Sequence, residues 1–506
     1  MQNKIESGFT EPELADAGFA QRVRSAMAWR WGTQVLAQAI TWTSTLIVVR
    51  LLEPSDYGLF ALTQVVLTAL AFLNGYSFAT SLIQADRVDD RQVSQVFGML
   101  FLANGALAAA QFLLAPLAAS YYGQPLVADM LRIQAVIFLT TPFIALPSAL
   151  LARRIEFRNQ GLVNLACALV GASVALILAW LGFGVWALVY APIAMAATRA
   201  LGLTIAARLL VWPSFNFRGA GAILSFGGAL TLCQLFWIIQ SQSDIFIAGR
   251  VFNTHDLGLY SEALFLTLIV TGRFLPPINE VAFPAYAELH KAGRSLAPFF
   301  LRTLRTVLLV TAPIYIGLSL VADAAILTLF GAKWSAMAPI VAGLAIAMPA
   351  MALQIVCSPA TNALGKARIY LTTSAVGAVL YPALFLIGIA YGPMGLVQAW
   401  WIGAPLLLLV TLALTLPVIG LSFGKLIAEL LPIIFACAIM ALIVSAAKAA
   451  LGAAPAHIQL VLIVPAGALA YIATLWALRP PLLRETWAML RQRQSPGLEH
   501  EDAPSP

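Results

Sequence analysis

The sequence predicts an all-α integral membrane protein of about fourteen transmembrane helices, arranged in two pseudo-symmetric bundles around a central cavity. Hydrophobic residues form 61% of the 506-residue chain, and charged residues form only 10%. Soluble domains carry roughly 25% charged residues. Apolar segments close to the length of a membrane-crossing helix follow one another along the chain, and one motif occurs twice.

The repeated motif reads RLLEPSDYGLF at residues 50–60 and RVFNTHDLGLY at residues 250–260. Its Arg, Asp and Gly positions are conserved between the two copies, 200 residues apart. Each copy ends one long apolar segment and begins the next. A duplication of this kind predicts two similar halves with a substrate path at their interface.

Each apolar segment is close to the roughly 20 residues that a helix needs to cross a bilayer. In order they span residues 27–51, 57–83, 94–119, 125–151, 161–181, 183–208, 219–249, 257–286, 299–321, 336–363, 369–390, 393–417, 427–447 and 458–478. They predict an N-terminal bundle over 25–218, a C-terminal bundle over 219–417 and two additional spans over 418–478. We expect residues 1–24 to be a cytoplasmic segment and residues 479–506 a cytoplasmic basic tail with a disordered end.

The loop charges predict the orientation of the spans. Of the 29 Lys and Arg residues, those opposite the N-terminal side are Arg50, Arg250, Lys333 and Lys448. Arg132, Arg199 and Arg273 lie within spans, and the rest lie on the N-terminal side. Positive charge gathers on the cytoplasmic side of membrane proteins, so we expect both termini in the cytoplasm.

The sequence gives little support for a metal site, a catalytic site or nucleic-acid binding. The four cysteines and four histidines show neither metal-ligand nor disulfide spacing, so we expect no metal and no cofactor. The loops are too short for a catalytic domain, and we assign no catalytic residue. The net charge of +7 is spread among loops of a membrane protein, and we expect no nucleic-acid partner.

Three segments resemble the polysaccharide flippases of bacterial inner membranes, the O-antigen and exopolysaccharide translocases of the multidrug, oligosaccharidyl-lipid and polysaccharide exporter superfamily. They are RLLEPSDYGLFAL (50–62), DIFIAGRVFNTHDLGLYSEA (244–263) and VAFPAYAEL (281–289). The resemblance implies movement of undecaprenyl-diphosphate-linked oligosaccharides to the periplasmic leaflet by alternating access. It leaves the sugar unidentified, and it makes a polysaccharide polymerase and a chain-length regulator candidate partners.

Two stripes of polar side chains recur at helical spacing on repeat-equivalent spans. The stripe on the first span consists of Arg30, Gln34, Gln38, Thr41 and Thr45. The stripe on the seventh span consists of Gln234, Trp237, Ser241 and Asp244. Facing one cavity, they would offer amides and a cation to sugar hydroxyls and a diphosphate. The alternative is that these groups only join neighbouring helices by hydrogen bonds.

Aromatic and acidic residues accompany the stripes. Trp42 and Trp237 suit the apolar faces of sugar rings, although Trp also anchors helices at membrane interfaces. Asp244 is a candidate for coupling to a proton or sodium ion, or for a simple ion pair with an arginine. We interpret Asp56 and Asp256 as helix-capping residues, because each precedes a glycine at a helix start.

Arg273 is the deepest cation in the expected membrane core, and we assign it to the substrate diphosphate. Gly272 leaves room beside it, and Pro276 and Pro277 interrupt the helix beyond it. Snorkelling, or pairing with Glu280, is the alternative. A cation-coupled multidrug antiporter of the same superfamily is the alternative function. It should carry carboxylates deep in the bundle, where this chain has arginines.

Overall fold

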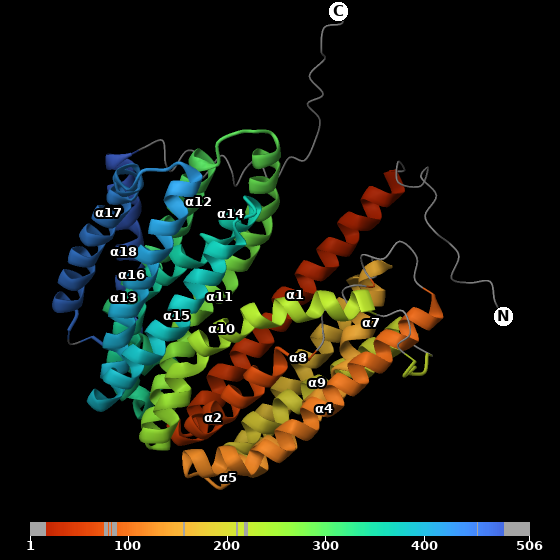
Figure 1. Ribbon diagram of the computed structural model, residues 1–506. Helices are drawn as coiled ribbons and strands as arrows, with labels where there is room; N and C mark the ends of the chain where they lie inside the picture. Colours follow the sequence, from red (N-terminus) through yellow and green to blue (C-terminus); the bar gives the residue numbers. More distant parts are fainter. Residues whose placement is uncertain are drawn as a thin grey trace, which may run out of the picture. The chain divides into compact units, whose positions relative to one another are not determined.

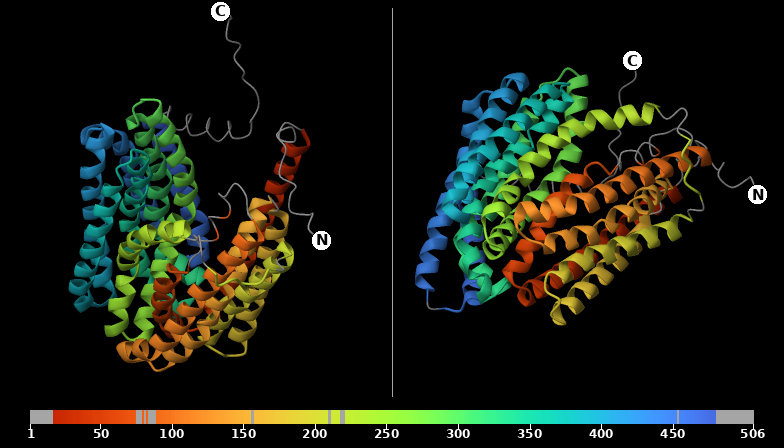
Figure 2. Two further views of the ribbon diagram at one scale, coloured as in Figure 1. Left: turned by 45° about the vertical axis from the view of Figure 1, so that its right-hand side comes forward. Right: turned by 60° about the horizontal axis from the view of Figure 1, so that its bottom comes forward.

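The structure is a computed structural model that describes residues 17–74, 79, 82, 89–154, 157–208, 211–216, 221–452 and 454–479. These residues are nearly all helical and include no strand, which confirms the predicted all-α class (Figure 1). The chain divides into two compact units, Met1–Gly258 and Leu259–Pro506. Figure 2 shows the helices of each unit from two further sides.

The first unit is a bundle of long helices with short connections. It contains α1 (Ala17–Leu51), α2 (Pro54–Ala71), α4 (Asp90–Tyr122), α5 (Leu126–Gln134), α6 (Val136–Thr140), α7 (Pro142–Arg153), α8 (Phe157–Trp180), α9 (Trp186–Ala207) and α10 (Gly221–Val251). Helix α8 packs between α1 and α9, and α2 packs against α10 and α5. The apolar faces of these helices form the core of the unit.

The fourth predicted span differs from a single helix. It is divided into α5, α6 and α7, with breaks at Ala135 and Thr141. Pro142 begins α7, and a proline has no N–H to continue the hydrogen-bond ladder of the helix before it. The three pieces together, Leu126–Arg153, still have the length and hydropathy of one span.

The second unit begins within α11 (Thr254–Lys291), after Gly258. It continues through α12 (Ala297–Leu329), η2 (Ala332–Met337), α13 (Ala338–Ile355), α14 (Ser358–Ala363), α15 (Ala367–Gly388), η3 (Ile389–Tyr391), α16 (Gly392–Ile419), α17 (Phe423–Ala450) and α18 (Ala456–Leu478). Helix α12 packs against α13, α17 and α18. The Tyr471 hydroxyl of α18 donates to the Leu309 carbonyl of α12 at 2.9 Å, so the last two helices belong to the same packed unit.

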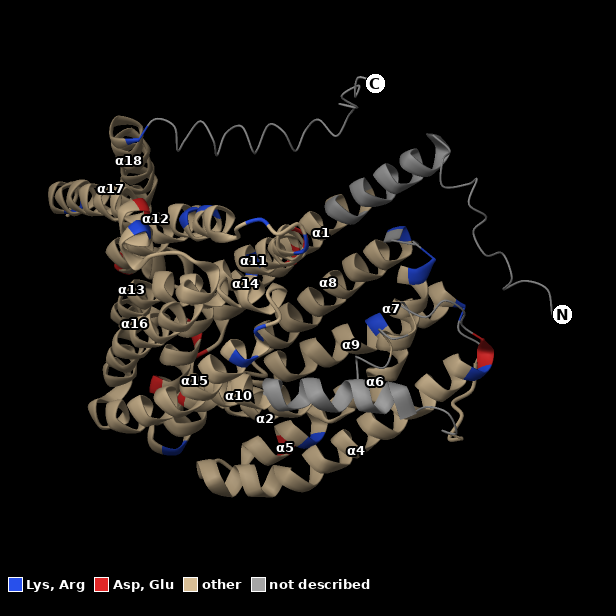
Figure 3. Cartoon of the chain, turned by 45° about the horizontal axis from the view of Figure 1, so that its top comes forward, with Lys and Arg blue, Asp and Glu red and all other residues tan. Residues whose placement is uncertain are grey.

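Ten helical stretches within the described residues are long and apolar enough to cross a membrane. One of them, Ala367–Ile419, comprises both α15 and α16, which are separated at Gly392 by a left-handed φ of 70°. Every predicted span overlaps a described helix, whereas the number of fourteen stays a prediction. Figure 3 shows Lys, Arg, Asp and Glu mainly near helix ends and loops, as expected for helices that span a bilayer.

Candidate functional site

The two copies of the repeated motif contact each other through their backbones. A Cβ built on Gly58 would lie 1.9 Å from the Thr254 carbonyl oxygen, and one on Gly258 would lie 1.7 Å from the Pro54 carbonyl oxygen. Pro54 and Thr254 are repeat-equivalent, as are the two glycines. The contact is therefore reciprocal, with each copy placing its glycine against the first helical residue of the other. Only glycine allows so close an approach.

The predicted capping role is confirmed for Asp56 at the start of α2, whereas at the start of α11 the capping side chain is Asn253 and not Asp256. The Glu53 amide donates to Asp56 Oδ2 at 3.0 Å, which closes a capping box at the start of α2. At the start of α11, the Asp256 amide donates to Asn253 Oδ1 at 2.8 Å, and Asn253 Nδ2 donates to Asp256 Oδ2 at 2.9 Å. Both carboxylates thus have structural partners next to their own helix.

Arg250 has an aromatic partner that the sequence did not indicate. Its guanidinium lies 5.3 Å from the centre of the Tyr121 ring and also donates to the Tyr121 carbonyl. Tyr121 in turn stacks on Phe246, with ring centres 4.8 Å apart. These contacts join the end of α10 to the end of α4 through a cation–π pair. Because 129 residues separate Arg250 from Tyr121, no local pattern could reveal the pair.

The stripe on α1 lies beside the face that packs on α8. That face carries Thr33, Ala37 and Ser44, which are buried, and the Ser44 hydroxyl donates to the Ala172 carbonyl of α8 at 3.4 Å. Gln34 is exposed and Gln38 is half-buried, while Arg30 has no described side chain. The hydroxyls of the stripe, on Thr41 and Thr45, donate to carbonyls of α1 itself. The described bonds of these threonines therefore do not join α1 to a neighbour.

The stripe on α10 contains both exposed and buried side chains. Trp237 is 42% exposed and meets Phe72 edge to face, with ring centres 5.0 Å apart. Ser241 donates to the Ile238 carbonyl of its own helix at 3.4 Å. Asp244 is 1% exposed, and its Oδ1 accepts the Ile245 amide at 2.7 Å. The side chain of Gln234 lies outside the described part.

The structure does not bring the two stripes together by direct packing. Helix α1 packs on α8, and α10 packs on α2, with no extended contact between α1 and α10 among the described residues. Trp42 is exposed on α1, at 49%. That both stripes line one cavity stays a prediction.

Arg273 is an exposed side chain near the middle of α11, with roughly 27 Å of helix on either side. A Cβ on Gly272 would meet nothing within 4 Å, so the space beside the arginine is open. Within the described residues, no ion pair joins Arg273 to Glu280. At 100° per residue, Glu262, Arg273 and Glu280 share one side of α11, a line of charge that the sequence analysis recognised only in part.

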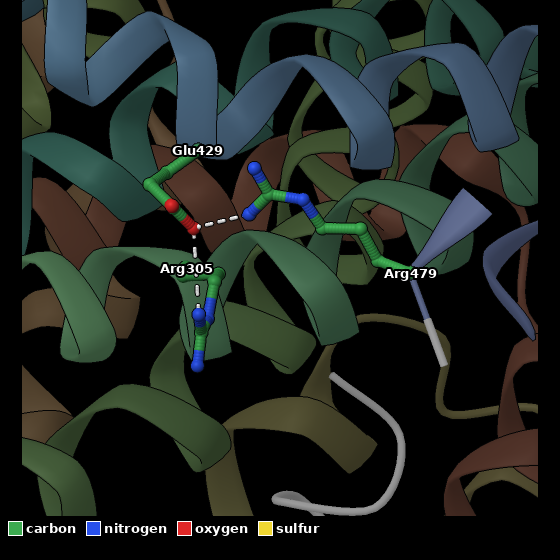
Figure 4. Close-up of polar contacts among 3 residues, drawn as sticks. All are labelled: Arg305, Glu429 and Arg479. Carbon is green, nitrogen blue, oxygen red and sulfur yellow. Dashed lines mark hydrogen bonds and ion pairs between the residues drawn. The ribbon is translucent and has the colours of Figure 1, made fainter. Parts of the chain in front are cut away.

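A second charged cluster lies in the second unit and was missed by the sequence analysis (Figure 4). Glu429 of α17 accepts from Arg479 Nη1 at 2.9 Å and from Arg305 Nη1 at 3.4 Å. The carboxylate joins α12 to the end of α18 across 124 and 50 residues of sequence. Sequence reasoning assigned these arginines to loop charge, because pairing across three helices leaves no periodic pattern.

The long apolar helices define a multi-helix membrane protein. The model of the family "Polysaccharide biosynthesis protein" matches residues 47–339, and this chain belongs to that family. The match includes both copies of the motif and Arg273. It ends at residue 339, in the first turn of α13, so the last helices lie beyond it.

Two curated relatives have similar sequences. The succinoglycan biosynthesis transport protein ExoT of Rhizobium meliloti (strain 1021) is 26% identical over 328 residues, 65% of this chain and 66% of ExoT. The teichuronic acid biosynthesis protein TuaB of Bacillus subtilis (strain 168) is 26% identical over 271 residues, 53% of this chain and 56% of TuaB. The chain therefore spans about two thirds or less of the length of these two relatives.

A solved structure confirms the fold over a larger part of the chain. The lipid II flippase MurJ, in an inward closed conformation, matches with a TM-score of 0.71 and 15% identity. The match covers 89% of this chain and 99% of MurJ. At that identity the likeness establishes a common helical fold.

Proposed function

We propose that this protein is a flippase that moves undecaprenyl-diphosphate-linked oligosaccharide repeat units, of O-antigen or exopolysaccharide type, from the cytoplasmic to the periplasmic leaflet of a bacterial inner membrane. Membership in a polysaccharide biosynthesis family supports the substrate class. The fold shared with MurJ supports a translocation mechanism by alternating access. Both termini face the cytoplasm in this proposal, in keeping with the loop charges.

Arg273 is the observation on which the proposal mainly depends. A guanidinium near the middle of a 38-residue apolar helix is costly unless it faces water or an anion. The Arg273 side chain is exposed, and Gly272 leaves open space next to it. No described carboxylate forms an ion pair with Arg273. A diphosphate is an anion that a guanidinium binds through two parallel hydrogen bonds. Arg273 would hold the charged end of the lipid during its passage.

The polar stripes would contact the saccharide. Gln34 and Gln38 of α1 offer amides that can both donate to and accept from sugar hydroxyls. Trp42 and Trp237 are exposed, as a ring that stacks on a sugar must be. Arg30, Gln234 and Ser241 complete the proposed contacts. Asp244, buried on α10, is the ion-coupling candidate.

The experiment that tests this function is removal of the gene, followed by extraction of membrane lipids. We expect an undecaprenyl-linked oligosaccharide to accumulate on the cytoplasmic side, and the intact gene supplied on a plasmid to clear it. An unchanged lipid-linked pool together with altered drug resistance would contradict the proposal and favour the cation-coupled antiporter.

A further inference from the structure

A basic cavity lies at one end of the first unit, and neither the stripe residues nor Arg273 are among its described lining residues. It has a volume of about 660 Å³ and lies between the end of α7, the first turns of α8 and the end of α9. Its polar lining consists of Arg154, Asn159 and Arg208. Its apolar lining includes Leu162, Val163 and Ile205.

The described charged residues that line the cavity are both arginines. Within the part of the chain that the structure describes, no acidic residue lines it. Arg154 is held in place by a hydrogen bond to the Ala207 carbonyl at 3.4 Å, so its position is tied to the end of α9. Arg208 is exposed and caps α9 with a left-handed φ of 50°, a conformation found mostly in glycine and asparagine. Two guanidiniums thus border one open space.

A comparison within the same chain shows what is unusual about this arrangement. A second cavity, of about 420 Å³, lies beside Arg302 and Arg305 in the second unit. Its lining includes Glu429, which pairs with Arg305 at 3.4 Å. There the protein supplies its own anion. At Arg154 and Arg208, no described lining residue supplies an anion.

The apolar side of the cavity indicates what kind of anion would fit. Ile205 is 74% exposed and Leu162 is 42% exposed, so the arginines adjoin a surface of aliphatic side chains. A free inorganic anion gains nothing from such a surface, whereas a lipid buries hydrocarbon on it next to its phosphate. The loops that contain Arg154 and Arg208 are also on the predicted cytoplasmic side, where anionic lipids attract basic pockets between helices.

We propose that this cavity binds the headgroup phosphate of an anionic phospholipid of the cytoplasmic leaflet. Arg154 and Arg208 contact the phosphate, and the acyl chain lies along Leu162 and Ile205. The lipid is a bound membrane component and is not the transported molecule. The site is therefore independent of the proposed flippase activity.

Native mass spectrometry of the full-length protein in detergent tests the proposal, with phosphatidylglycerol, phosphatidylcholine and inorganic phosphate as probes. We expect phosphatidylglycerol to bind more tightly than phosphatidylcholine. Arg154→Gln and Arg208→Asn should each weaken phosphatidylglycerol binding about fivefold, the effect of one cation next to an anionic headgroup. Arg208→Lys should retain most of the affinity, and asparagine tolerates the left-handed backbone of Arg208.

Arg302→Gln is the matched control, because it removes an exposed arginine from the cavity that contains Glu429. If Arg302→Gln weakens phosphatidylglycerol binding as much as the two cavity variants do, the lipid is attracted to the basic surface in general. That result would overturn the proposed site. Unchanged binding in both pocket variants would overturn it as well. Displacement of the lipid by an equal concentration of inorganic phosphate would mean a free-anion site instead. If Arg154→Gln fails to fold, judged by gel filtration, Arg208→Asn decides alone.

Discussion

Gly58 and Gly258 meet at the contact of the two motif copies, where a Cβ on either would lie 3.0 Å from the amide nitrogen of the other. The contact makes clear why the motif occurs twice. Each copy supplies a glycine and a helix start, and each is needed to accommodate the other. The repeated glycines therefore serve packing between two helix starts, while Asp56 caps α2 and Asn253 caps α11.

Substitution of either glycine should destabilise the protein. Gly58→Ala and Gly258→Ala each place a methyl group within 2 Å of a backbone carbonyl oxygen, so the helices must move apart. We expect a cost of at least about 2 kcal/mol and less folded protein in the membrane, with valine worse than alanine. Abundance measured by fluorescence-detected gel filtration checks this prediction.

Gly105→Ala is the control for the glycine prediction. Gly105 is a helical glycine of α4 with nothing within 4 Å of its built Cβ. Alanine there should change stability by no more than about 1 kcal/mol, and in the favourable direction. Normal abundance of Gly58→Ala combined with lost transport would mean that the motif acts in gating.

Hydropathy was sufficient to place the helices, because a membrane-crossing helix must be apolar over a fixed length. Hydropathy could not show that the span at 125–151 is divided into three helices. The residues on both sides of Pro142, where α7 begins, are equally apolar. The close contact of Gly58 with Thr254 was equally hidden. A glycine at a turn indicates freedom or close approach, but the sequence does not name the neighbour.

The candidate site was predictable to a smaller extent. Helical periodicity identified which residues share a face of α1, but the neighbour of that face depends on packing. Ser44 is an example. It lies 200 residues before Asp244 and is therefore its equivalent in the repeat, but its hydroxyl donates to the Ala172 carbonyl of α8, which the repeat does not predict. The pairing of Glu429 with Arg305 and Arg479 left no sequence signal, because the partners lie on three different helices.

The two stripes can be tested by labelling. In a background in which all four cysteines are replaced, Gln34→Cys and Gln234→Cys should both react with a membrane-impermeant thiol reagent if they line a water-filled cavity. We expect substrate-mimicking lipid diphosphates to slow both reactions. Rates measured by gel shift in membranes provide the comparison.

Leu36→Cys and Ile239→Cys are the matched controls for the labelling. Both native residues are exposed in the structure and lie on the sides of α1 and α10 away from the stripes. Contact with lipid should protect them. Equal labelling of all four positions, or of none, would remove the cavity interpretation.

The Glu429 cluster should contribute measurably to the stability of the second unit. Its carboxylate is 25% exposed and has two arginine partners, so Glu429→Gln should lower the free energy of unfolding by about 1 kcal/mol. Asp129→Asn, which breaks an exposed pair with Arg132 at 3.5 Å, should cost less than about 0.5 kcal/mol. Thermal unfolding in detergent should rank the two in that order, and the reverse order would contradict a role for the cluster.

Arg273 provides the sharpest test of the proposed transport function. Arg273→Lys keeps the positive charge but loses the planar pair of donors that suits a diphosphate, so it should retain part of the transport. Arg273→Gln removes the charge and should retain little. Clearance of the lipid-linked oligosaccharide pool in the gene-deleted strain measures both variants, with protein abundance recorded in parallel.

Arg132→Gln is the control for loss of an arginine within a predicted span. Arg132 pairs with Asp129 near the end of α5 and is partly exposed, so its replacement should leave transport close to normal. Protein abundance distinguishes a role of Arg273 in diphosphate binding from a role in folding. A variant that has lost only binding stays folded and is present at the normal level. If Arg273→Gln clears the lipid pool normally, or fails only because the protein is degraded, the assignment of the diphosphate to Arg273 is wrong.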